Sequence, residues 1–269
     1  MKVLEAVFLT SAARAADVPR HAEPQIALVG RSNVGKSSLI NALTRSTVAR
    51  TSGAPGKTRL ANLYRIALSG SLRPEADPEA RGRGPVAGGR WTVYLVDLPG
   101  YGFARGGEDA RAYFARLTSE YFGLGRLKAA PTARERARPQ PDDAGGGRLQ
   151  PDDTRGGRLQ PDDTRGGRLQ PARPSAALLV VDARHPGLAS DLDAWDWIQS
   201  LGLASAVVAT KIDKLGRADR TRALGELECA LNSPVTAVSA ATGEGMDQLW
   251  KRIATLVTPS KKGTAADRP

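Results

Sequence analysis

The sequence reads Gly30-Arg31-Ser32-Asn33-Val34-Gly35-Lys36-Ser37 between an apolar run and a helical pattern, and this stretch indicates the fold. It fits the phosphate-loop pattern G-x-x-x-x-G-K-[ST]. Its glycines allow backbone N–H groups to surround a phosphate without Cβ clashes. Lys36 is spaced to reach the β and γ phosphates of a nucleotide, and Ser37 to offer its hydroxyl to Mg²⁺.

The segments on either side supply the context that this loop requires. Residues 26–29 form a short apolar run typical of a buried parallel strand. Residues 37–44 carry leucine and isoleucine at helical spacing, and the start of that helix adds a positive dipole end. A strand, a glycine loop and a helix therefore follow one another in the order that a phosphate site needs.

The same alternation of strands and helices continues along the chain. Short apolar runs at 91–96, 177–181, 206–209 and 235–238 are typical of strands, and helical patterns lie at 191–201, 220–231 and 246–257. Strands that alternate with helices predict an α/β fold in three layers, with a mostly parallel central sheet flanked by helices.

Polar motifs follow two of these predicted strands. Asp97-Leu98-Pro99-Gly100 comes after one of them, where a carboxylate can hold Mg²⁺ through water and a glycine leaves its N–H free to approach a γ-phosphate. Thr210-Lys211-Ile212-Asp213 comes after another. Asp213 can accept hydrogen bonds from guanine N1–H and the 2-amino group, which adenine does not offer in that arrangement. The stem of Lys211 can lie over the base plane.

Two shorter motifs complete the set. Ser239-Ala240 follows the strand expected at 235–238, and backbone N–H groups there could donate to guanine O6. Thr58, in Gly56-Lys57-Thr58, could supply a second hydroxyl to Mg²⁺ when GTP is bound, which makes its segment a candidate switch. Each motif alone is also an ordinary turn or surface loop. Together they lie where parallel strands end, and ligands bind at that edge.

The motifs resemble a known family. Residues 30–43, Pro55-Gly56-Lys57-Thr58, Asp97-Leu98-Pro99-Gly100-Tyr101 and Val181-Asp182-Ala183-Arg184-His185 are similar to the bacterial EngB family, also called YihA or YsxC, within the translation-factor-related GTPases. The resemblance spans about residues 3–257, except for the two insertions at 69–90 and 129–174. It implies a Ras-like P-loop GTPase domain with Mg²⁺, acting in assembly of the large ribosomal subunit and needed for normal cell division and septation.

Carried onto this chain, the resemblance and the motifs give one set of expected GTP-binding residues. These are Gly30, Arg31, Ser32, Asn33, Val34, Gly35, Lys36, Ser37, Gly56, Lys57, Thr58, Arg59, Leu60, Asp97, Leu98, Pro99, Gly100, Thr210, Lys211, Ile212, Asp213, Val238, Ser239 and Ala240. Lys36, Thr58 and Gly100 are the expected catalytic positions, with Asn33 as a candidate K⁺ ligand. Ser37 and Thr58 are the expected Mg²⁺ ligands, and Asp97 acts on the metal through water.

The position after Asp-x-x-Gly indicates slow hydrolysis. Many small GTPases place a glutamine there to orient the attacking water, whereas this chain has Tyr101. We therefore expect low intrinsic turnover. One hypothesis is that Asn33 helps to hold a K⁺ ion that replaces an arginine finger. The alternative is that Asn33 only closes the phosphate loop by hydrogen bonding.

Two segments interrupt the expected single domain of residues 1–257. Residues 69–90, rich in glycine, proline and charge, lie between two strand candidates and are expected to be an extended hairpin loop. Residues 129–174 contain three copies of a ten-residue repeat with one leucine each, which cannot bury enough surface to offset chain entropy. We expect a disordered insertion that the loop tolerates, or an arm for a partner. Residues 258–269 are expected to be a flexible basic tail.

Composition suggests where the protein acts. The formal net charge of +11 favours a polyanionic partner such as the large ribosomal subunit precursor, although a generally basic composition would give the same value. The single cysteine, Cys229, fits a reducing compartment and a small core position. We expect a cytoplasmic monomer without a membrane span, with Trp195 and Trp197 partly buried. A second hypothesis is a septation scaffold in which GTP only sets a binding state.

Overall fold

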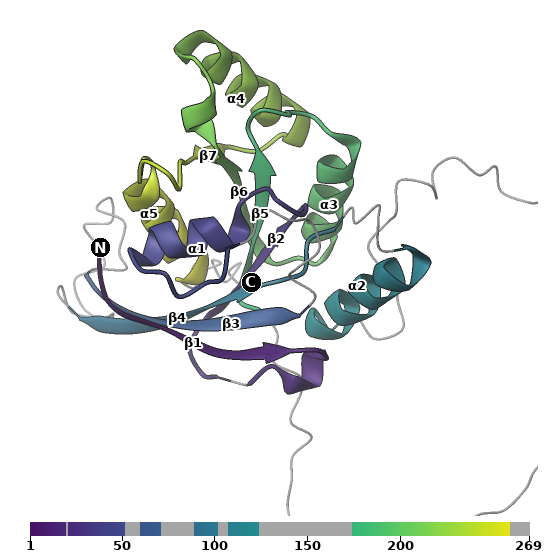
Figure 1. Ribbon diagram of the computed structural model, residues 1–269, viewed down its shortest axis with the longest axis vertical. Helices are drawn as coiled ribbons and strands as arrows, with labels where there is room; N and C mark the ends of the chain where they lie inside the picture. Colours follow the sequence, from purple (N-terminus) through teal and green to yellow (C-terminus); the bar gives the residue numbers. More distant parts are fainter. Residues whose placement is uncertain (20, 52–59, 71–88, 102–106, 124–173, 259–269) are drawn as a thin grey trace, which may run out of the picture.

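One mixed sheet organises the molecule, seen in Figure 1. The computed structural model describes residues 1–19, 21–51, 60–70, 89–101, 107–123 and 174–258. Within these ranges seven strands lie in the order β1-β3-β4-β2-β5-β6-β7. They are β1 (Lys2–Ala12), β2 (Gln25–Gly30), β3 (Ala61–Ser69), β4 (Arg90–Asp97), β5 (Ala176–Asp182), β6 (Ala204–Thr210) and β7 (Val235–Ala237).

The strand directions match the expectation of a mostly parallel sheet. From β4 through β2, β5 and β6 to β7, each neighbouring pair is parallel. Only β3 runs the other way, and it pairs antiparallel with both β1 and β4. The central strands β2 and β5 are buried along their whole length, because helices cover both faces of the sheet there.

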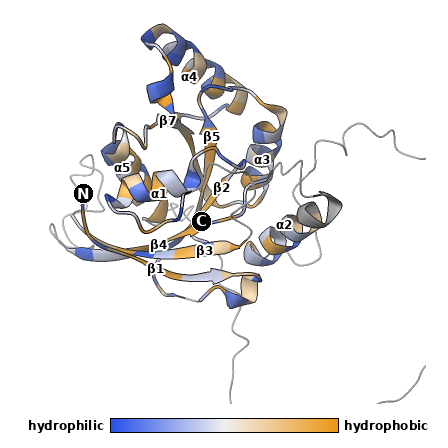
Figure 2. Cartoon of the chain, viewed as in Figure 1, coloured by the Kyte–Doolittle hydropathy of each residue, from blue (hydrophilic) through white to orange (hydrophobic). Residues whose placement is uncertain are grey.

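Helices cover the two faces and close separate cores. They are α1 (Lys36–Thr44), α2 (Gly107–Tyr121), α3 (Ala189–Ser200), α4 (Arg217–Leu231) and α5 (Met246–Val257), with short 3₁₀ turns at η1 (Ala15–Asp17) and η3 (Ile212–Lys214). Residues of α1 and α5 pack on one face, and residues of α2, α3 and α4 on the other. Figure 2 shows hydrophobic residues concentrated in the central strands and hydrophilic ones along α4. The three-layer α/β prediction is confirmed.

Two elements were not predicted from the sequence. The amino-terminal β1 pairs with β3 along most of its length, but its register shifts between Val3 and Glu5 and between Phe8 and Thr10. Those shifts interrupt the alternation by which a strand is recognised. The helix α2 carries Leu117 and Tyr121 four residues apart, both buried in the core. That spacing was an available signal for a helix.

Side-chain expectations outside the site were partly wrong. Cys229 is exposed rather than in the core, because its apolar neighbours Leu227 and Leu231 lie two residues away on either side. Residues two apart on a helix do not share a face. Trp195 and Trp197 are more deeply buried than expected, each about 6% exposed.

The expected insertions lie mostly outside the described residues. The pairing of β3 with β4 continues to Ser69 opposite Arg90, and Gly70 N–H donates to the Gly89 carbonyl at 3.3 Å. The two strands therefore meet where residues 71–88 connect them. The repeat segment at 129–174 falls outside the described ranges except for Pro174, and the tail at 258–269 falls outside except for Thr258. In the part of the chain that is described, no helix is long and apolar enough to cross a membrane.

Candidate functional site

The predicted motifs meet at one edge of the sheet. The loop between β2 and α1 lies at the carboxyl end of β2, and the other motifs follow the carboxyl ends of β4, β6 and β7. These strands are parallel, so all four loops lie on the same edge. The register of Asn62 opposite Asp97 brings the start of β3, next to exposed Leu60, to that edge as well. The sequence-predicted residues that are described are therefore brought together.

The loop from Gly30 to Ser37 has a backbone conformation suited to binding an anion through its N–H groups. Gly35 has φ +105°, a left-handed conformation that side-chain-bearing residues rarely adopt, and it directly precedes α1. Asn33 also has a positive φ of 64°. Val34 is buried and anchors the loop in the core beside α1. The start of α1 thus faces the loop, where a helix offers unpaired N–H groups to an anion.

Lys36 is folded onto its own loop. Its Nζ donates to the Gly30 carbonyl at 3.0 Å and to the Arg31 carbonyl at 3.2 Å. The residue is only 7% exposed, and this burial lowers the pKa of the amine, although nearby Asp97 acts in the opposite direction. Two backbone carbonyls satisfy the ammonium in this arrangement. Phosphate oxygens would be stronger acceptors for the same hydrogens.

Ser37 and Asp97 form a hydrogen-bonded pair in which one carboxylate oxygen is left to bind a further group. Ser37 Oγ lies 2.7 Å from Asp97 Oδ2. Asp97 is fully buried, and its Oδ1 has no hydrogen-bond partner within the described structure. Burial raises the pKa of this carboxyl, while Lys36 and the Ser37 hydroxyl act in the opposite direction. A hydroxyl beside a carboxylate with a spare oxygen fits Mg²⁺, a hard cation that prefers oxygen ligands.

The segment after β4 lies directly on the phosphate loop. Leu98 and Pro99 are buried, and a Cβ on Gly100 would lie only 2.4 Å from the Ser32 backbone nitrogen. Ser32 N–H donates to the Tyr101 carbonyl at 3.4 Å. Glycine is therefore required at position 100 in this conformation. A loop N–H that could serve a phosphate is here directed at the protein's own backbone.

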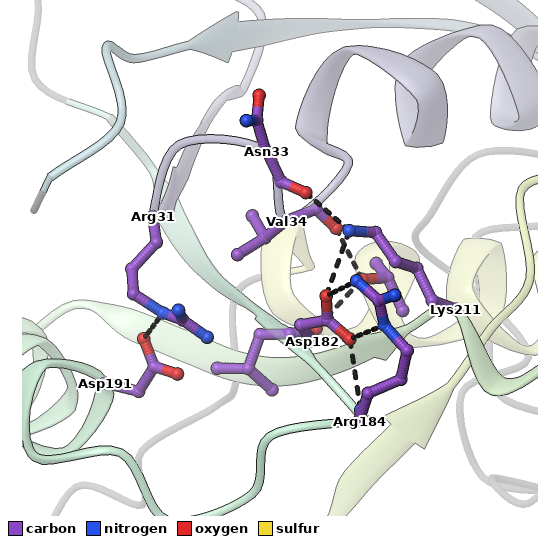
Figure 3. A network of polar contacts seen from close by, with 9 residues as sticks. Arg31, Asn33, Val34, Asp182, Arg184, Asp191 and Lys211 are labelled. Carbon is purple, nitrogen blue, oxygen red and sulfur yellow. Dashed lines mark hydrogen bonds and ion pairs between the residues drawn. The ribbon is translucent and has the colours of Figure 1, made fainter. Parts of the chain in front are cut away.

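The Tyr101 side chain belongs to a polar cluster centred on buried Asp191. Its hydroxyl donates to Asp191 Oδ1 at 2.8 Å, and Arg31 Nε donates to the same oxygen at 2.9 Å (Figure 3 shows the arginine contact). Asp191, in α3, is 1% exposed, and burial raises its pKa although Arg31 and Tyr101 counteract this. Burial beside Asp191 also raises the pKa of Tyr101. The cluster joins the phosphate loop, the Asp-x-x-Gly segment and α3.

The end of the site expected to contact the base is held by Asp213 and Ser239. Ser239 Oγ donates to Asp213 Oδ1 at 2.7 Å, and this hydrogen bond, together with Lys214, lowers the pKa of Asp213 despite partial burial. The carboxylate is thus oriented and charged. Ser239 N–H already donates to the Glu244 carbonyl at 3.0 Å, so a donor to a base would come from Ala240. Ile212 and Val238 are buried beneath these groups.

Thr210 and Lys211 connect the base end to the phosphate loop. Thr210 Oγ1 lies 2.6 Å from the Val34 carbonyl and 2.9 Å from the Val181 carbonyl. Lys211 Nζ donates to the Asn33 carbonyl. Two consecutive residues at the carboxyl end of β6 therefore contact two consecutive carbonyls of the loop, which fixes one motif relative to the other.

Comparisons with known proteins agree with this geometry. A family model described as 50S ribosome-binding GTPase matches residues 25–126. The probable GTP-binding protein EngB of Symbiobacterium thermophilum is 37% identical over 267 residues, covering 93% of this chain and 94% of that protein. The probable GTP-binding protein EngB of Anaeromyxobacter sp. (strain K) is 34% identical, covering 100% of this chain and 99% of that protein. This chain belongs to the EngB family.

Membership makes this EngB-family chain a P-loop GTPase, an enzyme that hydrolyses GTP. Solved structures agree on the fold. A point variant of Aquifex aeolicus Era bound to GDP and AlF4⁻ superposes with a TM-score of 0.52 at 18% identity, covering 88% of this chain and 58% of that chain. Era with MgGDPNP and nucleotides 1506–1542 of 16S ribosomal RNA gives a TM-score of 0.54 at 17% identity, covering 92% and 61%. The chain thus spans about three fifths of these Era chains.

Some expected residues of the EngB-family site are not placed. Gly56, Lys57, Thr58 and Arg59 lie outside the described residues, so the second Mg²⁺ hydroxyl and the Thr58 switch stay predictions. The Asn33 side chain is exposed and points away from Lys211 in Figure 3. Neither its K⁺ role nor its loop-closing role is tested by this arrangement.

The structure adds residues that the motifs did not assign. Asp191 pairs with Arg31 although the two residues are 160 positions apart in the sequence, so no local sequence pattern predicts the contact. Asp182 and Arg184 were noted as part of a family stretch without a role. Both lie at the carboxyl end of β5, and that position was the one signal that could have indicated them.

Proposed function

We propose that this chain binds GTP and GDP at the described sheet edge. The phosphates lie on residues 30–37, and the base lies against residues 210–213 and 238–240. The observation that carries the proposal is Asp213, oriented by Ser239 at 2.7 Å on the same edge as the phosphate loop. Guanine presents N1–H and a 2-amino group side by side, and one carboxylate accepts from both. An adenine base would leave that carboxylate unpaired.

Magnesium is the proposed cofactor, held by Ser37 and Thr58, with Asp97 acting through a water molecule. The spare Oδ1 of Asp97 and the adjacent Ser37 hydroxyl support this assignment. When bound, the ion neutralises phosphate charge. Lys36 would exchange its two carbonyl acceptors for phosphate oxygens. The Ser32 N–H would likewise exchange the Tyr101 carbonyl for a phosphate oxygen. Binding is then coupled to movement of the segment from Asp97 to Tyr101.

Intrinsic hydrolysis is proposed to be slow. Tyr101 has no amide, and its hydroxyl is engaged by buried Asp191, so it does not orient an attacking water in this arrangement. A K⁺ ion held by Asn33 is the proposed compensating group. Turnover measured in K⁺ and in Na⁺ buffer tests this, because a K⁺ ligand role requires a faster rate in K⁺. Equal rates would leave Asn33 without that role.

The proposed biological role is that of a GTP-controlled switch in assembly of the large ribosomal subunit, in the cytoplasm, with consequences for cell division and septation. The formal net charge of +11 and the description of the matching family model as 50S ribosome-binding support a ribosomal partner. The partner would be the subunit precursor, its RNA and proteins together, and the chain would act as a monomer.

Co-sedimentation with large-subunit precursors tests this role. Binding should require GTP rather than GDP and should weaken as salt rises, because phosphate contacts release counterions. A GTPase assay with and without the precursors should show stimulation. Binding that is indifferent to the nucleotide would instead favour the septation-scaffold hypothesis.

A further inference from the structure

One motif at the site edge has no assigned task. Val181-Asp182-Ala183-Arg184-His185 begins with the last two residues of β5 and lies between the phosphate loop and the base-binding motifs. β5 pairs with β2 on one side and with β6 on the other. Its carboxyl end therefore lies between the strand that leads into the phosphate loop and the strand that leads into Thr210-Lys211-Ile212-Asp213.

Asp182 is the polar centre of this motif. It is 4% exposed, and both of its carboxylate oxygens are engaged. Arg184 contributes three donors, with its backbone N–H and Nε on Oδ1 at 3.0 Å each and Nη2 on Oδ2 at 2.7 Å. Lys211 Nζ donates to Oδ2 at 2.9 Å. Burial alone would raise the pKa of Asp182, but the hydrogen bonds from Arg184 and Lys211 outweigh it and hold the pKa well below its usual range.

Lys211 is held at both ends. Its backbone has a left-handed φ of 61°. Its ammonium lies between the Asn33 carbonyl and the Asp182 carboxylate, as Figure 3 shows. A lysine stem otherwise samples many rotamers, and fixing it costs conformational entropy when a ligand arrives. Here two contacts within the chain already fix the ammonium end of the stem.

We propose that Asp182, braced by Arg184, is a positioning residue that holds the Lys211 stem in place for the guanine base. This inference rests on the proposed nucleotide site. The carboxylate keeps the ammonium at the phosphate loop, so the four-carbon stem spans the gap between loop and base as a fixed surface. The base then binds a preorganised platform and does not have to order a flexible chain. Asp182 itself need not touch the nucleotide.

The chemistry of the brace explains why an arginine is included. Asp182 is nearly buried, and one lysine donor would leave much of its acceptor capacity unused. The forked donors of Arg184, whose side chain is about 40% exposed, fill the remaining positions and fix the carboxylate plane. Removing Arg184 should therefore loosen Lys211 only indirectly, through Asp182. Its effect on nucleotide affinity should be smaller than that of removing Asp182.

A double-mutant cycle tests the inference. GDP affinity is measured by calorimetry for the unaltered chain, Asp182→Ala, Lys211→Ala and the double variant. We expect each single variant to weaken GDP binding by about tenfold. If Asp182 acts through Lys211, the double variant should be no weaker than Lys211→Ala. A merely structural role would lower the melting temperature but would leave the two losses multiplicative.

Further variants keep the test decisive if Asp182→Ala fails to fold. Asp182→Asn keeps the shape and should give an intermediate loss, and Arg184→Gln a loss of a few-fold. Asp219→Ala removes an exposed aspartate of α4 that also pairs with an arginine, Arg222, and it should leave GDP affinity unchanged.

The outcomes separate two failures. If Lys211→Ala weakens binding but the Asp182 variants do not, or if the losses multiply, the positioning role is wrong and the site stands. If the unaltered chain binds no GDP, the proposed function itself is wrong.

Discussion

The two ends of the site differ in how far they are prepared for a ligand. At the base end, Asp213 is oriented by Ser239, and Lys211 is held against Asp182 and the Asn33 carbonyl. At the phosphate end, Lys36 is folded onto carbonyls of its own loop, and Asp97 Oδ1 has no partner within the described structure. At the base end, side chains hold one another in place, whereas at the phosphate end Lys36 pairs with backbone carbonyls of its own loop.

This difference indicates where binding requires reorganisation. The base can dock onto groups that are already in place. The phosphates and the metal must displace contacts made by Lys36, Ser32 and Ser37. We expect changes at the phosphate end to alter affinity most, and changes at the base end to alter mainly the choice of base.

The largest effect is expected from Lys36→Ala. Two charge-assisted hydrogen bonds to phosphate would be lost, so GDP affinity should fall by at least about 100-fold. Calorimetry with GDP measures it. The fold should survive, because the variant also removes a buried ammonium whose pKa burial lowers. Lys251→Ala, on an exposed position of α5, is the matched control. Retained affinity in Lys36→Ala would mean that the phosphates bind elsewhere.

Asp213→Asn should change the preferred base. The amide presents a donor where the carboxylate presented an acceptor, so GDP affinity should drop by about 10- to 100-fold. Xanthosine diphosphate carries a carbonyl where guanine carries its amino group, and it should gain affinity. Competition binding with both nucleotides measures the exchange. An equal loss for both would show that Asp213 supports the fold rather than reading the base.

Gly100→Ala tests the contact between the segment after β4 and the phosphate loop. The new Cβ would meet the Ser32 nitrogen, so the ligand-free protein should lose about 1–3 kcal/mol of unfolding free energy. If nucleotide binding lifts this segment, the loss should shrink when saturating GDP is present. Thermal denaturation with and without GDP measures both values. The same loss in both states would show that the segment stays on the loop.

Ser239→Ala should give the smallest and most pH-dependent effect. The Ser239 hydroxyl is the main cause of the lowered pKa of Asp213, so the variant should raise that pKa back toward the ordinary range of an aspartate. Base binding needs the carboxylate and is lost as pH falls through the pKa of Asp213. The loss should therefore begin at a higher pH in the variant. GDP affinity measured from neutral pH down to the lowest pH at which the fold persists tests this, and identical pH profiles for the variant and the unaltered chain would contradict it.

Much of the site could be predicted because its motifs are local. Each spans at most eight consecutive residues, most lie at the end of a parallel strand, and parallel strands bring such ends to one edge. Asp191 could not be predicted, because its partners Arg31 and Tyr101 are 160 and 90 residues away. Only packing of α3 against the sheet places it there. The same limit applies to Asp182, whose role appears only once Lys211 is seen beside it.

The fold was predictable where periodicity is regular and not where it is interrupted. The uniformly apolar β2 and β5 stand out, because helices bury both of their faces. The register shifts of β1 removed its alternation, so an edge strand of eleven residues went unrecognised. The apolar neighbours of Cys229 suggest a core position, but Cys229 is exposed. Residues two apart on a helix do not share a face, so buried neighbours at that spacing do not indicate a buried cysteine.

The contact between Ser32 and Tyr101 has a kinetic consequence. A nucleotide competes there with a carbonyl of the same chain, so the apparent affinity is the intrinsic affinity reduced by the fraction of time the loop is open. Association should then saturate at the opening rate as nucleotide concentration rises. A partner that holds Tyr101 off the loop would speed nucleotide uptake without touching the nucleotide.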